Sequence, residues 1–178
     1  MKANTDLLRH LEFFHEFHIK EVESLSKIST IREVKEGEIL FNEDDDLDEL
    51  SIVIDGKIMI GMTVANKRKI GLETVISGQP LGWSALIPPY TATSFAQVQQ
   101  SGKLVVFRAT ELEALFQEER DGNLGYNFLL NLSKHISIRL RTSRYQLIKN
   151  KKKKNLNRER NDSYLSGFRT FFLLPDRF

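Results

Sequence analysis

Cysteine is absent from the 178 residues, so the chain forms no disulfide bond and offers no thiolate ligand to a metal ion. Long apolar runs are absent too. Residues 1–18 contain neither an apolar core nor a small-residue cleavage site, so we expect no signal peptide, no membrane span and a cytoplasmic location. Apolar residues make up 40% of the sequence and charged residues 28%, which is typical of a globular domain.

Histidine is scarce and scattered, which argues against an enzyme. The four histidines, His10, His15, His18 and His135, have no partners at a spacing that would build a catalytic set. His15 and His18 lie close together, but no third metal ligand accompanies them, so an exposed helical face is the favoured interpretation. We therefore predict no enzyme and no metal site.

An acidic run from Asn42 to Glu49 has aspartates at alternate positions, as at the start of a calcium-binding loop. Such a loop requires Gly at its sixth position and Glu at its twelfth, where this chain has Glu49 and Asp55. The run therefore predicts a solvated turn.

The apolar pattern changes period near residue 29. Before it the spacing is helical, and from Thr30 the period is two, with turns at Asp55-Gly56 and Ala65–Lys67 between strands. About eight short strands between residues 29 and 120 predict a mainly β fold with flanking helices, a jelly-roll-like β-roll.

Two helices are expected after the strands. Thr110 caps the first, from Glu111 to about Glu119, and Asp121-Gly122 ends it. The second, from Leu124 to Ile148, carries a narrow apolar stripe that suits either another helix or its own barrel. The stripe consists of Leu129, Leu132, Ile136, Leu140, Ser143 and Leu147.

Basic charge is concentrated in the last residues. The net charge is +2, but residues 150–178 contain eight Lys or Arg against three acidic residues, a balance of +5 that leaves −3 for the rest. For residues 151–178 we favour a solvated basic tail with an apolar end, whose lysines could bind nucleic acid or anionic lipid weakly.

The stretch from Val75 to Val98 is suited to binding an anion. After Gly82 we expect a short helical turn, from Trp83 to Ile87, which the Pro88-Pro89 pair stops. The first amides of such a turn have no intrahelical acceptor and bind anions. A tight strand connection capped by a serine is the alternative. The small residues that would let a ligand approach are Ser84, Ala85, Thr91 and Ala92.

Several motifs follow one another in a fixed order. They are Glu36-Gly37-Glu38-Ile39-Leu40-Phe41, Leu50-Ser51-Ile52-Val53-Ile54-Asp55-Gly56-Lys57-Ile58, Gly82 to Leu86, Thr91-Ala92 and Ala96. In these motifs, over residues 11–148, the chain resembles the cyclic-nucleotide-binding domain of catabolite-activator-like regulators and cyclic-nucleotide-dependent kinases. The resemblance implies a helical segment at 1–28, a double-stranded β-helix at 29–120, a dimerisation helix at 121–150 and a tail at 151–178.

Two positions depart from the family's pattern. The family has a Glu for the ribose hydroxyl where this chain has Trp83, and an Arg for the cyclic phosphate where it has Tyr90. Losing both charged contacts should lower the affinity for cyclic AMP on the order of a thousandfold. The ligand is then an altered one, or there is none.

The resemblance implies a ligand site made of two groups of residues. We expect a regulatory sensor that binds a small anionic ligand, a cyclic nucleotide or another, without a further cofactor. The cassette contributes Gly82, Trp83, Ser84, Ala85, Tyr90, Thr91 and Ala92, and the long helix contributes Arg139, Thr142 and Ser143.

The resemblance also implies a homodimer that carries the signal, with contacts through Leu129, Leu132, Ile136, Leu140 and Leu147. Residues 151–178 are too few for the family's winged-helix domain, so we expect no specific DNA binding. Two alternatives stay open. One is a ligand-free dimerisation scaffold whose cassette is filled by Trp83 and Tyr90. The other is a relative of the transcription regulators that lacks their DNA-binding domain and acts by forming mixed dimers.

Overall fold

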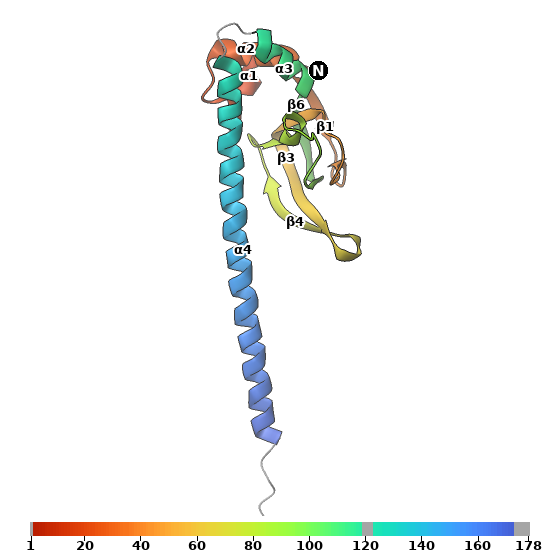
Figure 1. Cartoon of the computed structure of the whole chain (residues 1–178), viewed down its shortest axis with the longest axis vertical. Helices are drawn as coiled ribbons and strands as arrows, with labels where there is room; N and C mark the ends of the chain where they lie inside the picture. The colour runs from red at the N-terminus through yellow and green to blue at the C-terminus, as the bar shows by residue number, and fades with distance from the viewer. Residues whose placement is uncertain (1, 119–122, 173–178) are drawn as a thin grey trace, which may run out of the picture. The chain divides into compact units, whose positions relative to one another are not determined.

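The structure of the protein, a computed structural model, describes residues 2–118 and 123–172. The chain forms two compact units, Met1–Ile136 and Ser137–Phe178. The first contains the strands and the amino-terminal helices that Figure 1 labels, and the second contains the remainder of helix α4.

Short helices open the first unit, in the segment predicted to be helical. They are α1 (Thr5–Arg9), η1 (Glu12–Phe14) and α2 (Ile19–Ile28). The Asn4 side chain caps α1 by accepting the Leu7 amide at 2.7 Å. The Glu21 carboxylate accepts the His18 amide at 2.7 Å and so fixes the start of α2.

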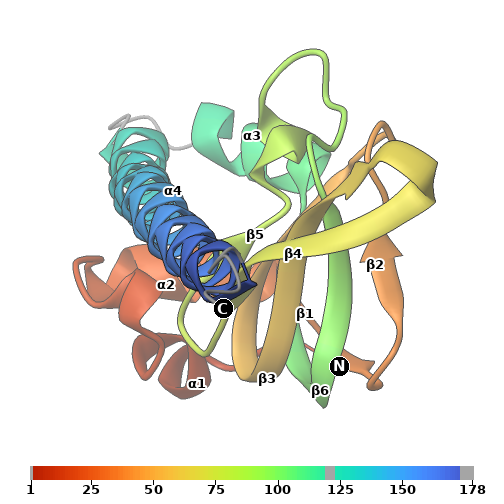
Figure 2. The same cartoon turned by 90° about the horizontal axis from the view of Figure 1, so that it is seen from below.

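The strands form an antiparallel sheet in the order β1-β6-β3-β4, with β2 on β6 and β5 on β3. Figure 2 shows β3 and β6 as the long central strands. This agrees with the predicted mainly β fold with flanking helices. The bounds are β1 (Thr30–Val34), β2 (Ile39–Phe41), β3 (Glu49–Val64), β4 (Arg68–Val75), β5 (Pro80–Leu81) and β6 (Phe95–Arg108).

The hairpin predicted at Asp55-Gly56 is wrong, because β3 runs through it. Gly56 has a φ of 94° within the strand, and the β3–β6 register shifts on both sides of it. A Cβ on Gly56 would lie 2.7 Å from the Gln100 carbonyl oxygen, so only glycine fits this bulge. The other predicted turn is confirmed as the short helix η2 (Ala65–Lys67), with Asn66 at a φ of 64°.

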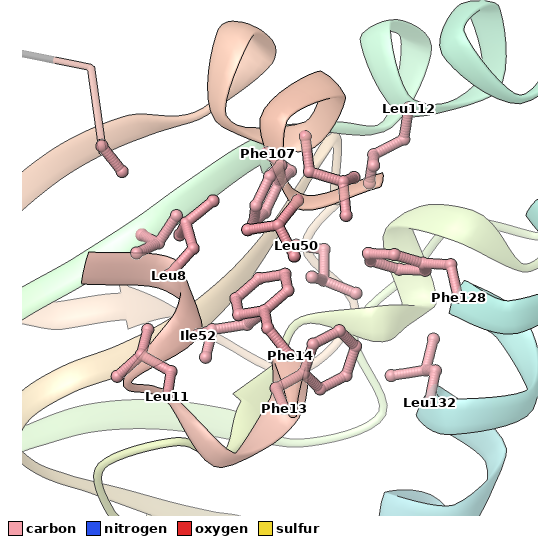
Figure 3. Packing of buried hydrophobic residues seen from close by; sticks show 14 of the residues in the cluster. Leu8, Leu11, Phe13, Phe14, Leu50, Ile52, Phe107, Leu112, Phe128 and Leu132 are labelled. Atoms are coloured by element: carbon pink, nitrogen blue, oxygen red, sulfur yellow. The ribbon is translucent and has the colours of Figure 1, made fainter. Parts of the chain in front are cut away.

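Two apolar cores hold the first unit together. One fills the sheet interior around Val53, Ile58 and Leu104. The other joins the amino-terminal helices to β3, β6 and the beginning of α4 (Asn123–Phe172), as Figure 3 shows. In it Phe13 meets Phe128 edge to face, with ring centroids 5.3 Å apart.

The two predicted helices exist with different bounds. The first is α3 (Ala109–Glu118), and the expected break at Asp121-Gly122 lies outside the described residues. Helix α4 does not end near Ile148 but continues to Phe172, so the expected linker in residues 151–172 is helical. Lys, Arg, Glu and Leu are good helix formers, and no proline interrupts this segment.

The predicted apolar stripe is split by its contacts. Leu132 is only 2% exposed, so it is not available as the dimer contact that we had expected. Ile136 is half-buried against the same core, and its place in a dimer stays a prediction. Leu129 and Leu140 are exposed, whereas the side chain of Leu147 lies outside the described residues. The predicted stripe therefore combined residues from two faces of α4. Apolar residues three or four positions apart occur on a face that packs against its own domain as well as on a face that could meet another helix.

Candidate functional site

A left-handed glycine opens the predicted anion-binding turn. Gly82 has φ 76° and ψ 21°, and the short helix η3 (Trp83–Leu86) follows it, as the sequence predicted. A Cβ on Gly82 would lie 2.8 Å from the Glu49 carbonyl oxygen, so the close approach of β5 to β3 also requires glycine here.

The hydrogen bonds of the turn occupy one of the amides expected to meet a ligand. The Ala85 amide donates to the Gly82 carbonyl at 3.1 Å, and the Ile87 amide donates to the Ser84 carbonyl at the same distance. The backbone N–H of Ala85 is therefore engaged by the turn itself. Contact of the Trp83, Ser84 and Ala85 amides with a ligand stays a prediction, and η3 is a tight 3-10 turn in which the Ala85 amide already has an internal acceptor.

The second wall of the cassette is fixed to the acidic run. After a cis Pro88-Pro89 peptide, the Tyr90 carbonyl accepts the Leu47 amide at 2.7 Å. The Ala92 amide donates to the Asp45 carbonyl at 2.9 Å, and Thr91 pairs with Asp46. Sequence reasoning took residues 42–49 for a solvated turn and missed this contact, since no local signal marks a pairing between distant segments.

The side chains of the cassette differ in exposure. Ala85 and Ala92 are buried, whereas Ser84 and Thr91 are half-buried and Tyr90 is exposed. Trp83 is half-buried and packs against the core formed with the amino-terminal helices. Trp83 therefore has a structural role in that core.

A cavity of about 360 Å³ lies next to Gly82 in the first unit. Of the predicted ligand residues, Gly82 alone is among the described residues that line it. The lining combines a buried apolar floor with a charged rim. It consists of Arg32, Leu40, Phe41, Asp45, Asp46, Leu47, Asp48, Glu49, Ser51, Leu81, Gly82 and Leu104.

Arg32 is already engaged by carboxylates at this rim. Its guanidinium lies 2.9 Å from a Glu38 oxygen and 4.0 Å from a Glu49 oxygen. A hydrogen bond from the Lys35 amide, at 3.0 Å, and then the Arg32 contact lower the pKa of Glu38 below its ordinary value.

The predicted helix residues belong to the second unit. Thr142 is exposed, and Arg139 and Ser143 are half-buried. Their place beside the cassette stays a prediction.

The described residues form neither a metal-binding cluster nor a membrane-spanning helix. Within residues 2–118 and 123–172, no three His, Asp or Glu side chains gather as a metal site requires. No helix in that part of the chain is both long and apolar enough to cross a membrane.

Comparisons with known proteins agree with this architecture. Among solved structures the chain is similar to a putative cyclic nucleotide-binding protein from Geobacter metallireducens GS-15 (TM-score 0.67, 22% identity, 78% of this chain and 98% of that one). It is similar to a cyclic nucleotide-binding domain from Methylobacillus flagellatus KT (TM-score 0.71, 18% identity, 82% and 81%). It is also similar to the Thermus thermophilus catabolite activator protein (TM-score 0.63, 20% identity, 76% and 61%).

No curated protein matches the sequence. The sequence model of the family described as "Cyclic nucleotide-binding domain" matches residues 31–119, which is half of the chain. With the antiparallel β-roll, the left-handed Gly82 and the η3 turn in that region, the chain belongs to the cyclic nucleotide-binding domain family.

Proposed function

We propose that this chain is a non-catalytic regulatory domain that senses a small anionic ligand at its cassette and signals through a homodimer. The observation that carries the proposal is the Gly82 turn, which lies inside the family match and has the tight backbone approach that only glycine allows. The ligand would contact the Ser84 backbone amide and the Thr91 hydroxyl. Neither residue lines the cavity next to Gly82.

The missing charges direct the choice of ligand. Trp83 packs in the core and Tyr90 is exposed, so neither supplies the carboxylate or the guanidinium that the family uses. A phenol donates one hydrogen bond without a charge, which is weaker than a charge-assisted contact. We therefore propose an altered anion and not cyclic AMP as the natural ligand.

The dimer would use the face of α4 that points away from the first unit's core. In that unit Tyr126, Leu129 and Leu130 are exposed on α4, and in the second unit Leu140 and Ile148 are exposed. Exposed apolar side chains at helical spacing favour contact with another helix. A change in ligand occupancy would alter the stability of this pairing.

Titration calorimetry tests the ligand. Wild-type protein and the Trp83→Glu/Tyr90→Arg variant are titrated with cyclic AMP, cyclic GMP and non-cyclic anions such as inorganic phosphate and acetyl phosphate. We expect the wild type to bind cyclic AMP on the order of a thousandfold more weakly than the variant. Micromolar binding of cyclic AMP by the wild type would refute the argument from the missing charges, and binding of nothing by either protein would favour the ligand-free scaffold.

Sedimentation equilibrium tests the dimer. Leu129→Asp/Leu130→Asp should convert it to a monomer, because two charges would be buried at the interface. Leu72→Asp, on an exposed residue of β4, is the control and should leave the dimer intact. A wild-type monomer at all concentrations would remove the dimer from the proposal.

A further inference from the structure

The acidic cavity is a separate feature from the cassette. Its volume of about 360 Å³ falls within the roughly 300–1,000 Å³ typical of small-molecule sites. Gly82 is the one predicted ligand residue in its described lining, although the rim residues Asp45, Asp46 and Leu47 pair through their backbones with cassette residues 90–92.

Negative charge dominates the cavity rim. Its described lining includes four acidic residues, Asp45, Asp46, Asp48 and Glu49, and a single basic one, Arg32. Arg32 is shared between Glu38 and Glu49, so its charge is already offset. Such a rim repels anions and attracts cations.

Two of the acidic rim residues, Asp46 and Asp48, are exposed to solvent. Asp45 accepts the Asn42 amide at 2.7 Å and the Asn42 side chain at 3.3 Å. In the described part of the chain, by contrast, no hydrogen bond or ion pair engages the carboxylates of Asp46 and Asp48. These two groups are the ones that a cation would meet without breaking an existing contact.

The floor of the cavity is apolar. Leu81 and Leu104 are each 1% exposed and belong to the core inside the sheet, and the partly buried Leu40 and Phe41 lie beside them. A hydrated metal ion gains no favourable contact from an apolar surface. The described acidic side chains also do not converge on one point as metal ligands do. A hydrocarbon or aromatic group would gain from covering it.

We propose that this cavity binds a small organic amine, with its ammonium group at Asp46 and Asp48 and its apolar part on Leu81 and Leu104. The cavity is thus a second ligand site in the β-roll, for a class of compound opposite in charge to a cyclic nucleotide. The inference does not depend on the function proposed for the cassette.

An NMR titration with three probes of one shape tests the proposal. Tyramine carries a positive charge, tyrosol is neutral and 4-hydroxyphenylacetate is negative at pH 7. In the full chain, tyramine should shift the amide signals of residues 46–51 and 81–82 and bind at least about fivefold more tightly than tyrosol. The carboxylate should bind most weakly of the three.

Two matched variants complete the test. Asp46→Asn/Asp48→Asn should reduce tyramine binding to the level of tyrosol, whereas Glu113→Gln/Glu118→Gln, the same change of charge on exposed residues of α3, should leave it unchanged. The proposal is overturned if tyramine does not shift the cavity amides, if the three probes bind equally, or if both variants affect tyramine alike. Its failure would leave the cassette's anion binding unaffected, because that is measured with other ligands.

Discussion

Replacing Gly82 with alanine should destabilise the first unit by two separable effects. A non-glycine residue in the left-handed conformation costs about 1–2 kcal/mol. The new Cβ would also lie 2.8 Å from the Glu49 carbonyl oxygen, and relieving such an overpacked contact costs about 1–3 kcal/mol more. Gly82→Ala should therefore lower the free energy of unfolding by about 2–5 kcal/mol.

Gly37 provides the matched control. Its φ is 86°, close to that of Gly82, but no atom lies within 4 Å of a Cβ built on it. Gly37→Ala should therefore show the conformational cost alone, about 1–2 kcal/mol. The difference between the two variants isolates the approach of the cassette to β3.

Urea unfolding measures both variants. Trp83, the one tryptophan of the sequence, is half-buried in the core and reports its loss by fluorescence, and circular dichroism provides a second probe. The melting temperature of Gly82→Ala should fall by about 3 °C more for each additional kcal/mol. Equal losses in the two variants, within about 0.5 kcal/mol, would refute the reasoning about the Glu49 contact.

Further predictions concern α4 and the rim of the roll. Leu132→Ala should lower the free energy of unfolding in urea by about 2–5 kcal/mol, because Leu132 is 2% exposed. Leu129→Ala should lower it by less than about 1 kcal/mol, because Leu129 is 48% exposed. Similar losses of stability in the two variants would contradict the assignment of these residues to different faces of α4. Asn131→Ala should cost about 1–3 kcal/mol, because the buried Asn131 amide donates to the Phe13 carbonyl, and an unchanged unfolding midpoint would contradict this. The pKa of Glu38 is lowered in the fold, so its stabilising contribution is present above its ordinary pKa of 4.5 and is lost as the pH falls through the lower folded value. The stability gap between wild type and Glu38→Gln should therefore narrow from pH 7 to pH 3, and a constant gap would exclude this role.

The fold was predictable because its signals are local. Helical spacing in residues 1–28, alternation after Thr30 and the order of glycines around the cassette each follow from short stretches of sequence. The left-handed conformation at Gly82 and the 3-10 turn after it were predictable for the same reason. At Asp55-Gly56 the same local logic failed, since a positive-φ glycine serves a bulge as well as a hairpin, and only the approach of β6 decides between them.

Features that depend on distant partners were not predictable. The stripe on α4 gave no sign that Leu132 faces the core and Leu129 faces away, because both have the same side chain and the choice depends on the position of Phe13 and its neighbours. The run at residues 42–49, which supplies most of the acidic residues around the cavity, pairs with Thr91 and Ala92, and the sequence carries no signal for that pairing.

The most direct test of the sensor account is an NMR titration of Trp83→Glu/Tyr90→Arg with cyclic AMP, with the amides of Gly82 and Ser84 assigned. If the turn can bind a ligand and lacks only the charged side chains of the family, the variant binds cyclic AMP. The largest changes in amide chemical shift then occur at Gly82, Ser84 and Thr91. If cyclic AMP does not bind, or shifts only signals far from the cassette, the Gly82 turn is a structural connection and not a ligand site.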